Sequence, residues 1–352
     1  METKRLVRII IFVVIIFAVF IFVPKGPVVE DSGAQVVMGT FARVVAVGRH
    51  RDISQRAIDR ALEQIRYIET IANVHDANSE ISKINSLARL EPVKVSDDMF
   101  EILKASIDYG RLTNGAFDVA VGPLVYMWQK AGEANQPPDA NQLSAMLKEV
   151  DYQKLYLNPV DRTVQFGADG MKLDLGGIAK GYAIDRAIEA MKDVGAFGGM
   201  VDIGGDIRCF GTPANAARNW IIGLQDPAAN NRNIIVLKLD DLAVATSGDY
   251  RRFVLVGGKK HSHIIDSHTG QSAEQLSSVS VIAPKGVDAD ALATAVSVMG
   301  TDEGLKLIES IKNTDAIIIS PAPDYKITVT EGAEKYISKS RTKVNIYKTQ
   351  ND

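Results

Sequence analysis

The spacing of apolar residues predicts one early strand and two long helices. Residues 36–47 alternate in a strand-like way. Over residues 54–73 the apolar positions recur every three or four residues, which is typical of a helix with one buried face. A second helix is expected to begin at Ser96, whose hydroxyl can accept a hydrogen bond from the first turn, and to end near residues 114–115.

The rest of the chain alternates short apolar runs with turns. Residues 131–141 hold paired prolines among turn residues and predict an internal loop. Helices are expected at about 179–194 and 290–299. The expected strands are 155–157, 163–166, 173–175, 200–210, 220–224, 234–239, 243–246, 253–256 and 279–283. Because most successive strands are joined by turns too short for a crossover helix, the pattern favours an α+β fold with mainly antiparallel sheets and packed helices.

The N-terminus follows a different pattern. Lys4, Arg5 and Arg8 precede a run from Ile9 to Val23 that contains no charged or polar residue. Such a segment is typical of an export signal or of a single apolar membrane helix. We expect an uncleaved anchor, since no small-residue cleavage site and no cysteine for lipid attachment follows; a cleaved signal peptide is the alternative. The basic residues before the run predict a cytoplasmic N-terminus, an inner-membrane location and a periplasmic or extracytoplasmic position for the rest of the chain.

Composition narrows the class of protein. The 352 residues are 46% hydrophobic and 24% charged, as in ordinary globular proteins. Lys+Arg 40 against Asp+Glu 43 gives a net charge of -3, so we expect no nucleic acid as a partner. Cys209 is the single cysteine, which excludes an intramolecular disulfide and the paired-cysteine zinc and redox motifs.

Three glycine-rich or hydroxyl-rich segments are candidates for ligand binding. The common nucleotide and hydrolase motifs are absent from the sequence. Residues 174–182 run from a strand into a helix through three glycines, so backbone amides and Lys180 can meet an anion such as phosphate. A tight turn with a solvated lysine is the alternative. Residues 198–206 allow close approach of a flat ligand or another backbone, and structural turns explain them equally well. Residues 245–250 place hydroxyls at the end of a strand, which is a weak signal alone.

The last two candidate segments carry histidines and a hard-cation pair. Three of the five histidines lie within residues 261–268, beside Asp266, which favours a general base over a stable zinc site; surface histidines are the alternative. Asp290 and Thr294 are four residues apart on an expected helix, so their oxygens lie on one side. A carboxylate and a hydroxyl are groups that a hard cation such as Mg²⁺ accepts. Helix capping is the alternative for the aspartate. Together, the five segments indicate phosphoryl transfer.

Eight blocks occur in a fixed order between about Val36 and Val329. They are Met38-Gly39-Thr40, residues 79–85, residues 115–118, residues 176–182, Gly204-Gly205-Asp206, residues 245–248, residues 263–266 and residues 289–294. In this order the blocks resemble the motifs of the ApbE family of FAD:protein FMN transferases. The resemblance implies a mixed α+β unit built on antiparallel sheets. It also implies an exported, Mg²⁺-dependent enzyme that splits FAD, releases AMP and joins FMN to a threonine or serine hydroxyl of an acceptor protein.

The resemblance also implies roles for individual residues. Asp290 and Thr294, with a backbone carbonyl near Gly177, would hold Mg²⁺, and Lys180 would contact the FAD phosphates. His263 would be the catalytic base, with Asp290 and Lys180 as the other catalytic residues. The residues implied to line the flavin and adenosine sites are Met38, Ala116, Phe117, Asp118, Thr246 and Ile265. The family often has asparagine and proline where this chain has Asp202 and Ser267.

The acceptors implied are exported or membrane redox subunits. Two other functions stay open at this stage: an FAD pyrophosphatase that yields FMN and AMP, and a non-catalytic, membrane-tethered flavin-binding protein. The expected organisation is an anchor or signal segment at 1–26, a linker at 27–35, an ApbE-like flavin transferase domain at 36–337 and a polar C-terminal tail at 338–352.

Overall fold

The computed structural model describes residues 26–213, 219–229, 232–248 and 253–348. The apolar helix expected near the N-terminus lies at 1–26, essentially outside these residues. Among the helices that are described, none combines the length and the apolar character needed to cross a bilayer.

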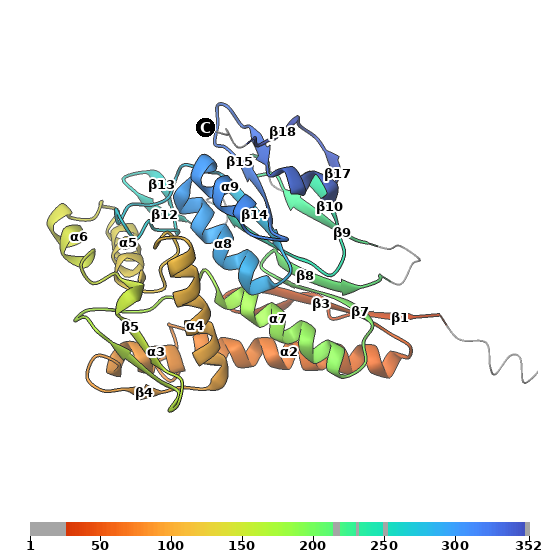
Figure 1. Cartoon of the computed structure of the whole chain (residues 1–352), viewed down its shortest axis with the longest axis horizontal. Coiled ribbons are helices and arrows are strands. Elements are labelled where there is room, and N and C mark those ends of the chain that lie inside the picture. Colours follow the sequence, from red (N-terminus) through yellow and green to blue (C-terminus); the bar gives the residue numbers. More distant parts are fainter. Residues whose placement is uncertain (1–25, 214–218, 230–231, 249–252, 349–352) are drawn as a thin grey trace, which may run out of the picture.

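A ten-stranded sheet forms the centre of the protein (Figure 1). Its neighbouring strands are antiparallel except for the last pair, β16 and β18. In spatial order the strands are β1 (Val28–Asp31), β3 (Thr40–Gly48), β7 (Gly198–Ile203), β8 (Asp206–Gly211), β11 (Ala243–Gly248), β14 (Ser278–Ala283), β15 (Asp315–Ile319), β16 (Ile327–Val329) and β18 (Val344–Ile346), with β2 (Gln35–Val37) paired to β3.

Three small sheets surround the main one. The first has the order β17 (Ile337–Ser340), β10 (Asn233–Leu239), β9 (Trp220–Gln225). The second has the order β4 (Val93–Lys94), β6 (Thr163–Phe166), β5 (Leu155–Asn158), and the third is the hairpin of β12 (Phe253–Val256) and β13 (Lys259–Ser262).

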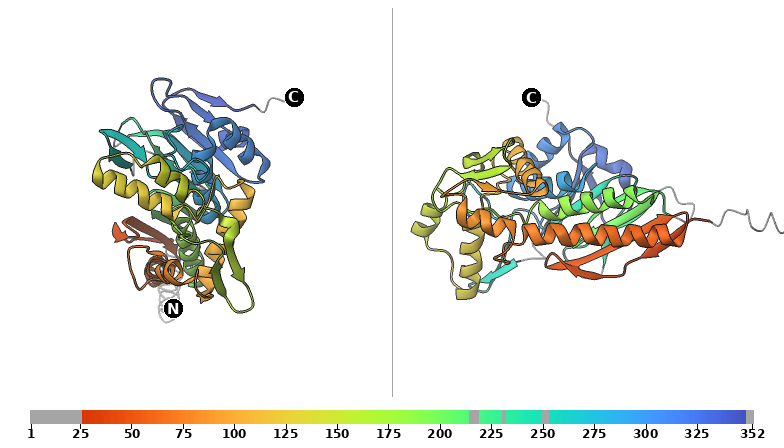
Figure 2. Two further views of the ribbon diagram at one scale, coloured as in Figure 1. Left: turned by 90° about the vertical axis from the view of Figure 1, so that its left-hand side faces the viewer. Right: turned by 90° about the horizontal axis from the view of Figure 1, so that it is seen from below.

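Helices cover one face of the main sheet, and α2 and α7 lie side by side (Figures 1 and 2). The helices are α2 (Arg51–Ala72), α3 (Glu80–Leu87), α4 (Asp97–Leu112), α5 (Gly122–Ala134), α6 (Ala140–Met146), α7 (Ala179–Asp193), α8 (Gly286–Met299) and α9 (Thr301–Ser310), with 3-10 turns at Tyr152–Lys154 and Glu331–Tyr336.

Strand alternation divides the core between the two faces of the sheet. In β3, Val44 and its neighbours two residues away pack in the cluster that includes Ile65 of α2 and Ile184 of α7. Val45 belongs to a second cluster, which includes Leu237 of β10. Because successive side chains of a strand point to opposite faces, β3 serves both clusters. The main sheet is therefore buried between helices on one side and the β9–β10–β17 sheet on the other.

The predicted α+β class with antiparallel sheets is confirmed, as are the two long helices. The Ser96 hydroxyl accepts a hydrogen bond from the Met99 amide at 3.2 Å, so it is the N-cap of α4 as expected. The loop predicted at 131–141 is wrong in extent. Helix α5 continues to Ala134, and Asp139 accepts from two backbone amides at the start of α6, so only a few residues around the prolines are non-helical.

Three other segments differ from expectation. Residues 173–175 form no strand, because the Asn85 side chain satisfies both backbone groups of Leu173. The predicted linker at 27–35 contains β1 and the first residue of β2. The predicted tail at 338–352 contributes the end of β17 and all of β18. Short, partly polar edge strands carry too few alternating apolar positions to be recognised from sequence.

Candidate active site

A half-buried lysine between two buried carboxylates forms the centre of the candidate site. Lys180 lies in the first turn of α7, Asp206 begins β8, and Asp290 lies in α8. The Lys180 Nζ contacts a carboxylate oxygen of Asp206 and lies 3.0 Å from Asp290 Oδ1. The side chains of Asp206 and Asp290 are only 5% and 4% exposed. The structure thus joins two residues proposed from the sequence, Lys180 and Asp290, with one that was not, Asp206.

The charges of this centre depend on one another. Burial opposes the positive charge of Lys180, but the two carboxylates outweigh burial and hold the pKa of the lysine above its ordinary value. Burial raises the pKa of Asp290 above the ordinary aspartate value, against the opposing effect of Lys180. One ammonium facing two ionised carboxylates leaves the centre with a net negative charge, which favours binding of a further cation.

Asp206 connects the centre to the neighbouring strand. It follows Gly204 and Gly205, which both have a positive φ and so make the tight turn from β7. Asp206 Oδ1 accepts from the Thr246 amide of β11 at 2.9 Å. Thr246 Oγ1 lies 2.8 Å from the hydroxyl of Ser280 on β14. The sequence signal for Asp206 was its place at the end of a glycine-rich block, but only the fold shows which groups it meets.

Asp290 and Thr294 lie on one side of α8, as their spacing predicted. Asp290 Oδ2 accepts from the Gly181 amide at 2.9 Å, and Thr294 Oγ1 donates to the Asp290 carbonyl oxygen at 3.2 Å. Gly177 lies directly opposite: a Cβ atom there would be 2.8 Å from Thr294 Oγ1 and 3.3 Å from the Phe117 ring. A side chain at position 177 would therefore displace the threonine hydroxyl, so glycine is required for this approach.

The oxygen donors of this centre fit a hard divalent cation. Carboxylate, hydroxyl and backbone carbonyl oxygens are the groups that Mg²⁺ binds. In the described part of the chain no three histidine, cysteine, aspartate or glutamate side chains gather into a metal-binding group. A cation held by Asp290 and Thr294 would therefore need oxygens from the backbone and from its substrate, which is how Mg²⁺ is commonly bound beside phosphates.

The segment 116–118 is held by burial of its side chains and by hydrogen bonds from backbone amides to the Asp118 carboxylate. Ala116 and Phe117 are buried, and Phe117 packs edge-on against Tyr109. The carboxylate of Asp118 accepts from the amides of Ala120 at 2.7 Å and Tyr152 at 3.0 Å. Burial raises the pKa of Asp118 to about 6, although these two hydrogen bonds oppose the shift.

The remaining predicted residues lie in other local settings. Met38 has a positive φ at the turn between β2 and β3, and its amide donates to Glu69 Oε1 at 2.6 Å. Ile265 is buried in a cluster with Trp128 of α5. His263 follows β13 directly and is exposed, between the buried residues Ser262 and Ile264.

The two departures from the family pattern have structural roles. Asp202 Oδ1 accepts from the Gly205 amide at 2.8 Å and so supports the turn before Asp206. Ser267 Oγ donates to the Gly115 carbonyl oxygen at 2.6 Å, and His268 Nε2 lies 3.0 Å from the Asn114 carbonyl oxygen. These contacts attach the loop after His263 to the segment that leads into Phe117 and Asp118.

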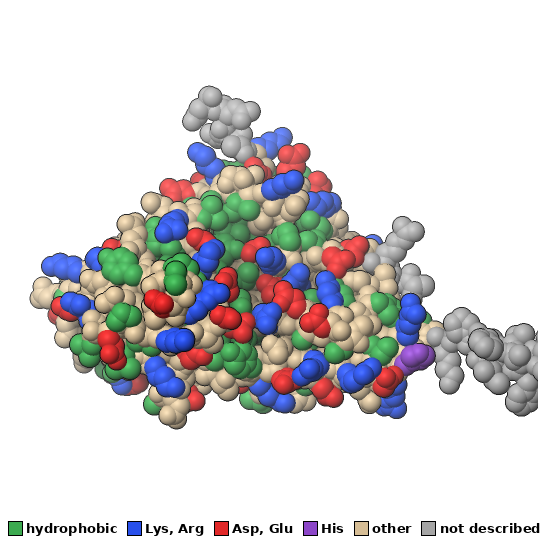
Figure 3. All heavy atoms as spheres, turned by 60° about the horizontal axis from the view of Figure 1, so that its bottom comes forward, with side chains coloured by type: hydrophobic (Ala, Val, Ile, Leu, Met, Phe, Trp, Pro, Cys, Tyr) green, Lys and Arg blue, Asp and Glu red, His purple; other side chains and the backbone are tan. Residues whose placement is uncertain are grey.

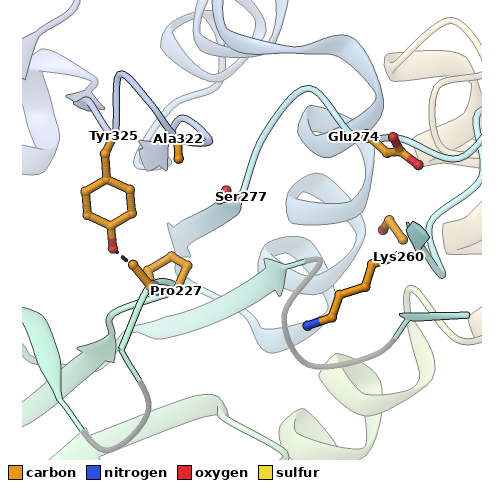
Figure 4. A pocket seen from close by; sticks show the side chains of 8 residues that line it. Pro227, Lys260, Glu274, Ser277, Ala322 and Tyr325 are labelled. Carbon is orange, nitrogen blue, oxygen red and sulfur yellow. Dashed lines mark hydrogen bonds between the residues drawn. The ribbon is translucent and has the colours of Figure 1, made fainter. Parts of the chain in front are cut away.

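Two open cavities lie near these elements. One, of about 470 Å³, is lined by residues of the β7–β8 turn, by Thr246 and by residues of β9, so it reaches the strand that holds Asp206. The other, of about 390 Å³, is lined by Ser262 next to His263 and by Lys260, Glu274 and Tyr325 (Figure 4).

On the face that carries α2, acidic and basic side chains are interspersed (Figure 3).

Comparison with known proteins agrees with the fold. The ApbE family model matches residues 38–318. An FAD:protein FMN transferase of Vibrio cholerae is 31% identical over 289 residues, which cover 81% of this chain and 85% of the relative. The corresponding protein of Treponema pallidum is 29% identical over 323 residues, which cover 88% of this chain and 89% of the relative.

Solved structures show the same similarity. The ApbE protein of Thermotoga maritima superimposes with a TM-score of 0.81 at 30% identity, covering 89% of this chain and all of that one. The flavin transferase ApbE of Vibrio cholerae superimposes with a TM-score of 0.76 at 26% identity, covering 88% of this chain and 99% of that one. The fold and the named relatives thus define an α+β enzyme. The chain belongs to the ApbE family.

Proposed function

We propose that this enzyme transfers FMN from FAD to a threonine or serine hydroxyl of an acceptor protein and releases AMP. The names of its relatives support flavin transfer. The observation that carries the proposal is the buried centre in which Lys180 meets Asp206 and Asp290 at the start of α7. A lysine at a helix N-terminus and oxygen donors suit a diphosphate with a divalent cation.

The chemistry is a single displacement at phosphorus. The acceptor hydroxyl oxygen forms a bond to the phosphorus of the FMN half, the bond from that phosphorus to the bridging oxygen breaks, and AMP leaves with that oxygen. The hydroxyl proton passes to His263, whose exposure allows a protein hydroxyl to reach it. Lys180 binds the diphosphate and offsets its charge, with Asp206 holding the ammonium in place.

We propose Mg²⁺ as the cation of this site. Asp290, Thr294 and a backbone carbonyl near Gly177 would hold it, and the approach of Gly177 to Thr294 supports this assignment. When bound, Mg²⁺ supplies charge neutralisation at the diphosphate. Asp290 would then exchange its Lys180 contact for the cation, and the ammonium would keep Asp206 and gain the phosphate oxygens.

We propose that the N-terminal apolar run tethers the enzyme to the inner membrane with the catalytic domain in the periplasm. The basic residues before the run support this orientation. The acceptors would then be exported proteins or membrane redox subunits. Fusing a reporter that is active on only one side of the membrane after residue 26 tests the orientation.

The experiment for the function uses the full chain with FAD, Mg²⁺ and an acceptor domain that carries a threonine target. We expect the acceptor to gain the mass of one FMN while AMP is released in equal amount. His263→Ala should bind FAD normally but lose transfer by about 10²-fold or more, the lower end of a general-base contribution.

The control is His261→Ala, because His261 pairs with Glu274 and packs at a tilt against the Trp128 ring. That variant should transfer near the parent rate. AMP release with no mass gain on any acceptor would instead identify an FAD pyrophosphatase. Transfer by His263→Ala at the parent rate would remove the base role from this histidine.

A further inference from the structure

Helices α7 and α8 both begin without a side-chain cap of their own. The N-cap residues are Ile178 for α7 and Lys285 for α8, and neither side chain makes a capping hydrogen bond. The first amides of a helix have no partner within the helix, so buried helix starts need acceptors from elsewhere. Here each helix receives its acceptor from the other.

Two buried aspartates supply these reciprocal caps. Asp290 of α8 accepts from the Gly181 amide of α7 at 2.9 Å. Asp185 of α7 accepts from the amides of Gly286 at 2.7 Å and Val287 at 3.0 Å, in the first turn of α8. Because a carboxylate at a helix N-terminus is also favoured by the helix dipole, each aspartate stabilises the start of the opposite helix.

The two helices are in backbone contact between these aspartates. A Cβ atom at Gly181 would lie 2.2 Å from the Gly286 carbonyl oxygen, and one at Gly286 would lie 2.6 Å from the Gly181 carbonyl oxygen. Neither position therefore tolerates a side chain without moving the helices apart. The reciprocal capping depends on this close approach, which Figure 1 shows as the packing of α7 against α8.

Asp185 also reaches the main sheet. Arg208 Nη1 of β8 lies 2.6 Å from Asp185 Oδ1 and is two residues beyond Asp206. Asp185 thus connects α7, α8 and β8. These are the three elements that supply Lys180, Asp290 and Asp206 to the candidate site.

We propose that Asp185 is a positioning residue for the Lys180–Asp206–Asp290 centre. It fixes the first turn of α8 against α7 and β8, and so sets where the Asp290 and Thr294 oxygens meet Gly177 and the substrate. The consequence for catalysis rests on the proposed function; the consequence for the local structure does not.

The test compares Asp185→Ala with Asp315→Ala in the full chain. Asp315 is a matched control, because both aspartates are 6% exposed and Asp315 also accepts a side-chain hydrogen bond, from Thr330 at 2.9 Å, away from α7 and α8. Both variants should lose global stability. Only Asp185→Ala should also weaken Mg²⁺-dependent FAD binding, by about 10- to 100-fold, as loss of a ligand-orienting partner does.

Amide hydrogen exchange supplies the readout that needs no substrate. In Asp185→Ala the start of α8 is no longer held against α7, so Asp290 caps the Gly181 amide less well and local opening costs less free energy. The first turn of α7, which includes the Gly181 amide, should therefore exchange about tenfold faster or more in Asp185→Ala than in Asp315→Ala. Asp185→Asn keeps an acceptor oxygen and should fall between the parent and Asp185→Ala in both measurements. If Asp185→Ala does not fold, the Asn variant decides by the same comparison.

Equal exchange and equal FAD binding in the Asp185 and Asp315 variants would overturn the positioning role. A parent enzyme that binds FAD and Mg²⁺ but transfers nothing would overturn the proposed function alone, because the binding and exchange differences would remain. A parent that does not bind FAD would also overturn the proposed function, with the exchange measurement still deciding on Asp185.

Discussion

Replacing Lys180 by methionine should separate two roles of the lysine, holding the fold and binding the diphosphate. Methionine fills most of the space of the lysine stem but carries no charge. It leaves the nearly buried carboxylates of Asp206 and Asp290 without their cation. Removing one partner of a buried ion pair costs about 3–5 kcal/mol, because the remaining charge stays desolvated.

The thermal shift follows from that free energy. At roughly 2–4 °C for each kcal/mol in large domains, the melting temperature of Lys180→Met should fall by about 6–20 °C in EDTA. A cation that binds the folded state alone restores about 2.7 kcal/mol at a concentration of 100 times its dissociation constant. Mg²⁺ should therefore stabilise the variant more than the parent, because it no longer competes with the lysine for Asp290. FAD binding should be weaker in the variant.

The assay is thermal unfolding of the parent and the variant in EDTA and across a Mg²⁺ titration, with FAD affinity measured in parallel. Lys104→Met is the control, since Lys104 forms an exposed ion pair with Asp108. Such a pair is worth roughly 0–1 kcal/mol and should leave both the melting temperature and the Mg²⁺ response near those of the parent. The reasoning is refuted if Lys180→Met melts with the parent, or if Mg²⁺ stabilises the two proteins equally.

Three further outcomes are expected. Asp290→Asn should reduce FAD cleavage far more than Asp288→Asn, measured as AMP release, because Asp288 bonds the Tyr109 hydroxyl outside the centre; equal losses would contradict the cation site. The pKa of Asp118, raised to about 6, should make the unfolding free energy fall by roughly 2 kcal/mol as the pH rises from 4 to 7. Urea unfolding at several pH values should show a smaller dependence of the unfolding free energy on pH in Asp118→Asn. An unchanged pH dependence would refute the raised pKa of Asp118. Burial raises the pKa of Cys209 to about 12, so thiol reagents should label the native chain only at the rate of unfolding; fast labelling would show an accessible thiolate.

Local signals in the sequence were sufficient for part of the fold and part of the site. The apolar period predicted α2, and Ser96 predicted the start of α4, since both depend on residues within a few turns of each other. The spacing of Asp290 and Thr294 placed their oxygens together for the same reason. Features that depend only on residues within one helix can therefore be predicted from the sequence of that helix.

The contacts of Asp206 and Asp185 could not be predicted from such local signals. Asp206 meets Lys180 across 26 positions of the chain, and Asp185 meets the Gly286 amide across 101 positions. Neither pairing leaves a periodic trace, because each depends on how separate elements pack. The helical ends of the 131–141 segment escaped prediction because its two prolines dominate the local signal, whereas Asp139 caps a helix immediately beyond them.

The strand order of the main sheet has a consequence for how the chain folds. From β1 to β18, every strand of the main path lies later in the sequence than the neighbour before it. A nascent chain can therefore add each strand to a partner that has already emerged, and no inner strand has to wait for a later one. Assembly can follow synthesis, with a single growing edge open to wrong pairing at any moment. The C-terminal β18 is the last strand to pair, so a chain that stops before it would leave that edge uncovered.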